Sequence, residues 1–231
     1  MACGLRLIDE TGNLFFEDFF VKKKELIMKT TQLISELQTT VQGIIETVEA
    51  EILPLNKAAL NWKPAPEAWS ILECFEHLNR YNRFYNAELE RALARSARPA
   101  AFQPGWLGNY FVQSISPGNT KPMKTMKHLN PLGSKLGVKV LEEFLAHQRH
   151  LLELLGKAKA ANLNQRLVKV EILPLLRLKT GDAFRFVVAH EQRHLQQAIR
   201  LKGGGADTVD AVDTVDSIDA VDTIDAVDSG Q

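Results

Sequence analysis

The sequence predicts an all-α protein, a four-helix bundle with a long crossover between the second and third helices. Four segments carry apolar residues at spacings of three and four, which is the period of an amphipathic helix. No segment shows the strict alternation of apolar and polar residues that is typical of a half-buried strand. The linker at about residues 96–133 carries five prolines, and its length favours a bundle with one long connection.

The first two helices have clear ends. The first is predicted from Thr30 to about Leu53, where Pro54 stops it. The second is predicted from Ser70 to about Ala94. It opens on Ser-Ile-Leu-Glu, a capping box in which the serine hydroxyl accepts from a free backbone amide and the glutamate reaches back to the cap.

The third helix is predicted from about Lys135 to Lys159, and the fourth from Thr180–Asp182 to a glycine breaker at residues 203–205. Pro174 argues against one continuous helix over this whole region, so residues 161–178 are expected to be an extended connection. Within the long linker, the apolar residues between Trp106 and Phe111 predict a short helix that covers one end of the bundle.

The bundle is expected to be one domain, residues 28–203, with two flanking segments of different character. Residues 1–27 form an N-terminal extension, either a short helix packed on the core or a segment upstream of a start at Met28. Residues 204–231 carry aspartate at every third position, a period that matches neither helix nor strand. We predict that this acidic low-complexity tail is disordered, since its charges repel and it has no large side chains.

Composition excludes several classes of protein. The formal net charge is zero over 231 residues, but residues 1–202 hold 28 basic and 20 acidic side chains, without a cluster dense enough to predict nucleic-acid binding. Two distant cysteines make no disulfide framework and favour the reducing cytoplasm. No apolar run approaches 18 residues and no secretory signal is evident, so we expect no membrane segment.

The most informative motif is His190-Glu191-Gln192-Arg193-His194. Histidines four residues apart leave the same face of a helix and can bind one ion. The motif matches the zinc-protease pattern H-E-x-x-H, yet no His or Glu follows it to supply the third ligand. Gln197 and Arg200 replace the Gly and His of the extended pattern. We therefore exclude a zinc protease and expect the third ligand to lie upstream.

His77 is the best upstream candidate, because it lies two turns into the second helix beside the inward-facing Leu78. The alternative is a core histidine without a ligand role. Three neutral imidazoles would leave coordination positions open for water or substrate, as a catalytic site requires. Within the His190–His194 motif, Glu191 is expected to be a surface or supporting residue rather than a general base. Gln197 is expected to line the pocket or orient a ligand.

Other reactive residues carry weaker signals. Glu73 is explained by the capping box, although it could also orient His77. We expect structural or solvent-facing roles for His147 and His150, and no role for His128. Trp69 is expected to anchor the helix start, and Trp62 to lie in the core or in a pocket wall. Cys74 is expected to be a small buried apolar residue, with a redox or thiol role as the alternative.

Two stretches together, Trp69 to Leu78 (WSILECFEHL) and His190 to Gln197 (HEQRHLQQ), resemble the DinB-like (DinB/YfiT) superfamily over about residues 28–202. The resemblance implies a four-helix bundle in which His77, His190 and His194 hold a divalent metal ion, such as zinc, nickel or iron. Some relatives are transferases or isomerases that use a low-molecular-weight thiol, and others are described as metal-dependent hydrolases. No catalytic residue beyond the ligands follows from the resemblance.

The leading hypothesis is therefore a metal-dependent enzyme that activates a thiol or water for transfer to, or hydrolysis of, a small electrophilic substrate. A second hypothesis is a metal-binding or stress-response module without catalysis. A third is a structural protein whose acidic tail recruits a basic partner. A homodimer is compatible with each, because such bundles often pair.

Overall fold

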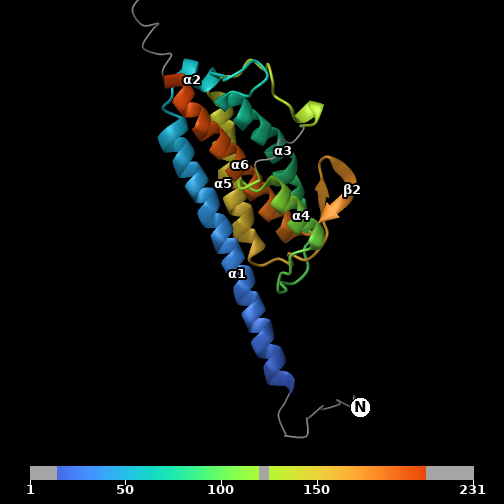
Figure 1. Cartoon of the computed structure of the whole chain (residues 1–231). Coiled ribbons are helices and arrows are strands. Elements are labelled where there is room, and N and C mark those ends of the chain that lie inside the picture. Colours follow the sequence, from blue (N-terminus) through green and yellow to red (C-terminus); the bar gives the residue numbers. More distant parts are fainter. Residues whose placement is uncertain (1–14, 120–124, 207–231) are drawn as a thin grey trace, which may run out of the picture.

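The computed structural model describes residues 15–119 and 125–206, with side chains from residue 30 to residue 204 outside that gap. The described residues form six α-helices and one small antiparallel sheet. Four long helices make up a bundle (Figure 1), which confirms the predicted all-α fold: α1 (Phe15–Thr47), α3 (Ile71–Ala94), α5 (Lys139–Ala158) and α6 (Thr180–Ala206). No helix in these described ranges combines the length and the apolar character needed to cross a bilayer.

The bundle has a square arrangement in which each diagonal pair is separated by the core. Helix α1 packs against α5 and α6, and α3 packs against the same two helices, so α1 and α3 occupy opposite corners. The core between them is apolar and closely packed, with the rings of Phe75 and Phe144 in an edge contact at 4.8 Å. Its fully buried members include Ile34, Val41, Val48, Phe75, Leu89, Leu141, Phe144, Leu151 and Phe184.

The capping box at the start of α3 is confirmed. The Ser70 hydroxyl accepts from the Glu73 amide at 3.2 Å, and the Ser70 amide donates to the Glu73 carboxylate at 2.9 Å. The same buried carboxylate accepts from Lys63 Nζ and from the amide of Gly133, each at 2.7 Å. Gly133 adopts a positive φ of 78°, which favours glycine. Glu73 therefore fixes the start of α3 to two separate loops.

The first helix starts earlier than predicted. Helix α1 begins at Phe15 instead of Thr30, and its N-terminal part projects beyond the other helices (Figure 1). Residues 15–27 are thus the beginning of a long helix and not a separate short helix on the core. A π-helical turn, Val48–Ile52, follows α1 before Pro54. Residues 1–14 lie outside the described part of the chain.

The fourth helix does not stop at the glycines. Helix α6 continues to Ala206, through the residues predicted to break it. A Cβ atom at Gly204 would lie 2.2 Å from the ring of Trp62, so glycine here allows the indole to pack directly on the helix. Trp62 therefore packs on the end of the bundle. Residues 207–231, which make up most of the tail predicted to be disordered, lie outside the described residues.

The connections contain more structure than the sequence predicted. The expected short helix in the linker is present as α4 (Trp106–Ile115), and the linker also forms the 3-10 turn η2 (Lys127–Leu129). A further short helix, α2 (Lys57–Asn61), precedes α3. A hairpin that no alternation in the sequence indicated is also present, because β1 (Val168–Val170) and β2 (Leu173–Leu178) pair antiparallel. Its irregular register and mostly exposed second strand leave no clean alternation in the sequence.

Helix α4 is attached to the start of α6 through a buried carboxylate. Asp182 accepts from the Gly105 amide at 2.9 Å and from Arg185 at 3.0 Å, and Arg185 also donates to Asn109 at 2.8 Å. Gly108 lies directly over this carboxylate, since a Cβ atom there would be 2.1 Å from Asp182 Cγ. The absence of a side chain at Gly108 is therefore a condition for docking α4.

We expect Gly108→Ala to lower the free energy of unfolding by about 1–3 kcal/mol, because the methyl group would overlap the Asp182 carboxylate. Gly156→Ala is the matched control. It lies on the exposed side of α5 with open space around it, and should raise stability by about 0.5–1 kcal/mol through helix propensity. Urea denaturation of both variants measures the difference, and equal effects would contradict the docking interpretation.

Candidate metal centre

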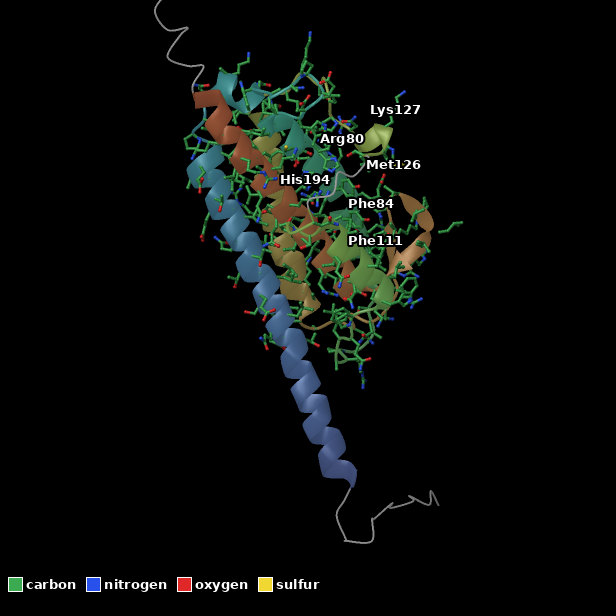
Figure 2. All side chains as sticks on the ribbon, in the orientation of Figure 1. Arg80, Phe84, Phe111, Met126, Lys127 and His194 are labelled. Atoms are coloured by element: carbon green, nitrogen blue, oxygen red, sulfur yellow. The ribbon has the colours of Figure 1, made fainter. Side chains whose placement is uncertain are left out.

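Three histidines from two helices meet inside the bundle. His77 comes from α3, and His190 and His194 come from α6, where Figure 2 marks His194. One ring nitrogen of each lies within 4.8 Å of the others, and the Nε2 atoms of His77 and His190 are 3.3 Å apart. Two nitrogens bound to a tetrahedral zinc ion would be separated by about 3.3 Å. The geometry thus brings together the three residues that the sequence singled out.

Hydrogen bonds fix the direction of two of these rings. His77 Nδ1 lies 2.8 Å from the carbonyl oxygen of Leu129, and His194 Nδ1 lies 3.0 Å from Gln197 Oε1. Since an oxygen of this kind only accepts, Nδ1 carries the proton in both rings and Nε2 keeps its lone pair. Gln197 therefore has the orienting role that was one of its two expected roles, and it also lines the cavity.

All three rings are neutral at physiological pH. They are 2%, 6% and 9% exposed, in the order His77, His190, His194. Burial lowers the pKa of His77 to about 4 and that of His194 to about 3. Burial, together with the neighbouring imidazoles, places the pKa of His190 well below its usual value. Neutral imidazole is the form that binds metal, so the set is ready to act as ligands without losing protons.

The end of the long linker holds the acceptor for His77 in place. Trp69 Nε1 donates to Asn130 Oδ1 at 3.1 Å, and Arg80 donates to the carbonyl oxygens of His128 and Asn130 at 3.1 and 3.0 Å. Figure 2 shows Arg80 near Met126 and Lys127, at the η2 turn. The Leu129 carbonyl is thereby fixed against α3. No local pattern in the sequence indicates that this loop supports the site.

The histidines form part of the wall of a cavity of about 580 Å³. Aromatic rings surround them: the ring centroid of Trp69 lies 4.7 Å from that of His77, and that of Tyr81 lies 4.4 Å from that of His190. Helix α4 and the hairpin supply a further part of the wall. The lining residues from these two elements are Tyr110, Phe111, Ser114, Ile115, Val170, Ile172 and Leu178. The volume is that of a pocket for a small organic molecule.

Tyr81 is a site residue that the sequence analysis missed. It lies one turn after His77 and shares its face of α3. Burial raises the pKa of its hydroxyl to about 12, so it stays protonated. The hydroxyl forms no hydrogen bond with the residues that the structure describes. The spacing of four from His77 was the signal that could have identified it.

Glu191 corrects one expectation of the sequence analysis. It is completely buried, not at the surface, and it accepts a hydrogen bond from Gln148 Nε2 at 2.6 Å. It is not among the residues that line the cavity, which argues against a general-base role. Burial raises its pKa from 4.5 to about 7, against the opposing effect of the Gln148 hydrogen bond.

The remaining candidates lie away from the cavity. His147 and His150 on α5 approach Glu143 and Glu90, at 3.4 and 4.0 Å, which agrees with the structural or solvent-facing roles expected for them. His128, for which no role was expected, is 2.7 Å from Glu171 and links η2 to the hairpin. Cys74 is buried outside the cavity lining, as expected for a small apolar residue.

The family model of the DinB superfamily matches residues 42–198, more than half of the chain. The chain belongs to the DinB superfamily. The match covers the end of α1 and most of α6, and it includes all three histidines. Comparisons with curated proteins and with solved structures found no match. The family assignment and the buried histidine cluster together fit a metal-binding DinB-like protein.

We expect Glu191→Gln to stabilise the metal-free protein at pH 8 by about 1–3 kcal/mol and to have no effect near pH 4. The folded protein keeps a proton on Glu191 up to about pH 7, whereas the unfolded chain loses it near pH 4.5. Stability therefore falls as pH rises between these values and stays lower above them. Urea denaturation in the presence of a chelator measures the effect.

Glu143→Gln is the matched control with the opposite sign. The hydrogen bond from Arg83 lowers the pKa of the Glu143 carboxyl, so this group contributes stability above its unfolded pKa. Its loss should destabilise the protein at pH 8 and have little effect at low pH. A Glu191→Gln variant that is no more stable than wild type at pH 8 would contradict the buried assignment of this carboxyl.

Proposed function

We propose that this protein is a metal-dependent enzyme that activates a thiol or a water molecule for transfer to, or hydrolysis of, a small electrophilic substrate. The observation that supports this best is the position of His77, His190 and His194 in the wall of a cavity of about 580 Å³. A metal-binding module without catalysis would not need such a cavity next to its ligands. We therefore favour the enzyme over that alternative.

The residues present suit a divalent ion. In our proposal Nε2 of His77 and of His194, and a ring nitrogen of His190, are the ligands. A bound divalent ion would lower the pKa of a coordinated water or thiol toward neutrality. Three imidazoles are compatible with zinc, nickel and iron. Leu129 and Gln197 would hold two of the rings in the productive orientation.

If a thiol takes part, we propose that it arrives as a low-molecular-weight co-substrate. Cys74 is buried and does not line the cavity, and burial raises the pKa of its thiol well above the usual range. A neutral, enclosed thiol is a poor nucleophile. Cys3 lies outside the described residues. The cavity has room for a small electrophile beside the histidines.

We propose a bundle domain of residues 28–203, which contains the family match, between an N-terminal extension and an acidic tail. We expect a cytoplasmic location, because the chain has two cysteines and the described one is unpaired. A small molecule is the proposed partner, with no role for nucleic acid or membrane, and a homodimer is compatible with the bundle.

We expect purified protein to bind one divalent ion per chain. His77→Ala, His190→Ala and His194→Ala should each abolish stoichiometric binding, and Gln197→Ala should weaken it by about 10- to 100-fold through loss of ring orientation. His150→Ala is the matched control, since this histidine lies on α5 outside the cavity. Metal analysis and chelator competition measure the affinities. Binding that survives all three alanine variants would refute the proposed centre.

A further inference from the structure

The cavity beside the histidines has a mostly apolar wall. Of the 22 lining residues that the structure describes, six are aromatic and eight are aliphatic. The aromatic rings lie closest to the histidines: Trp69 and Tyr81 contact two imidazoles each, and Phe186 stacks on His190 at 5.9 Å. Contact with such a surface stabilises a bound apolar group, whereas a polar group finds few hydrogen-bond partners there.

The side chains of Ser114, Tyr85 and Arg193 in the wall already have hydrogen-bond partners within the protein. The Ser114 hydroxyl donates to a backbone carbonyl of its own helix at 2.8 Å, and the Tyr85 hydroxyl accepts from the Glu171 amide at 3.3 Å. Arg193 donates to the carbonyl oxygens of Ser116 and Asn119 beyond α4. These groups shape the wall, and their hydrogen bonds leave them less available to a substrate.

Tyr81 is different. Its hydroxyl forms no hydrogen bond with a described residue, and its ring lies 4.4 and 5.0 Å from the rings of His190 and His77. A phenol is a hydrogen-bond donor at neutral pH. The cavity therefore combines the available hydroxyl of Tyr81, close to the histidines, with a mostly apolar wall.

The charges of the wall also argue against a strongly ionic substrate. Besides the histidines, the described lining contains one cationic and one anionic side chain, Arg193 and Glu67. These two charges offset each other. A substrate body that carried several carboxylates or phosphates would lose hydration in this cavity without a matching positive charge.

We infer that the substrate has an apolar body, such as a phenyl ring or a branched alkyl group, and an uncharged reacting end whose oxygen accepts a hydrogen bond from Tyr81. The inference rests on the proposed function, because the reacting end is placed beside the three histidines. Tyr81 is then a substrate-binding residue, and Phe111 and Phe186 contact the apolar body.

Cobalt-loaded protein and three hydroxamic acids test the inference through the visible absorption of the metal. Benzohydroxamic acid should bind about tenfold or more tightly than acetohydroxamic acid, because its phenyl ring is buried against the apolar wall. 4-Carboxybenzohydroxamic acid should bind more weakly than the unsubstituted phenyl compound, because its carboxylate is desolvated. Titration of free cobalt with the same compounds corrects for differences in chelation.

Two variants separate the contribution of the apolar wall from that of the Tyr81 hydroxyl. Phe111→Ala should weaken binding of benzohydroxamic acid and leave binding of acetohydroxamic acid unchanged. Tyr81→Phe should weaken binding of both compounds by about fivefold, because one hydrogen bond is lost, and should leave the affinity for cobalt unchanged. Thr39→Val is the control, since it removes a hydroxyl from an exposed residue of α1 that lies outside the cavity lining. It should leave binding of both compounds unchanged.

Failure of this inference can be distinguished from failure of the proposed function. Equal binding of the phenyl and methyl compounds, or unchanged binding in Tyr81→Phe, would overturn the inference while cobalt binding upholds the metal centre. Protein that binds no cobalt would overturn the proposed function instead. The same compounds are then titrated against metal-free protein by the fluorescence of Trp69, with Trp69→Phe as the blank, and the absence of a phenyl preference overturns the inference.

Discussion

Packing α3 against α6 buries three imidazoles in the wall of a cavity, and keeping those rings uncharged is the constraint on which the rest of the site depends. Two positive charges about 4 Å apart repel by about 4 kcal/mol at an effective dielectric constant of 20. Burial adds a desolvation cost for each charge. Both effects exceed thermal energy, so the folded protein strongly favours neutral rings. That state suits metal binding, and it requires each ring N–H to find an acceptor inside the protein.

The long linker meets part of that requirement. The acceptor for His77 is a backbone carbonyl at Leu129, more than fifty residues along the chain, and its position depends on contacts from α3 itself. Trp69 and Arg80 hold the loop on either side of it, and Glu73 holds the following turn at Gly133. Helix α3 thus supplies one imidazole and also positions the loop that orients it. The linker is a supporting part of the site as well as a connection.

The sequence predicted those features that depend on helix geometry over one or two turns. The spacing of His190 and His194 fixes a common face in any helix, and the Ser70–Glu73 capping box defines the start of α3 by local hydrogen bonds. The pairing of His77 with that face came from the superfamily resemblance and from its place beside Leu78. The all-α bundle followed from periodicity in four segments, and it is present with the predicted long connection.

Two of the errors came from contacts between residues that are far apart in the sequence. Glycines at 203–205 predict a helix end, but α6 continues because Trp62 packs on Gly204. The hairpin was missed because β2 is mostly exposed and pairs irregularly with β1, so neither strand alternates clearly. Nothing in the sequence distinguished Tyr81 from a core residue, since an apolar stripe and a cavity wall have the same period. For Gly204 and for Tyr81 the deciding neighbours, Trp62 and His190, lie far away in the sequence.

Glu191 shows how the surroundings of a helix change the meaning of a motif. In a zinc protease the glutamate of H-E-x-x-H acts on water beside the metal. Here α6 is contacted by α1, α3 and α4, so a residue one position beyond a site histidine faces the bundle interior. There Glu191 binds Gln148 and stays outside the cavity. In the proposed enzyme, a proton acceptor for an activated water or thiol would therefore come from another group or from the substrate, and the match to the protease pattern gives no information about this site's chemistry.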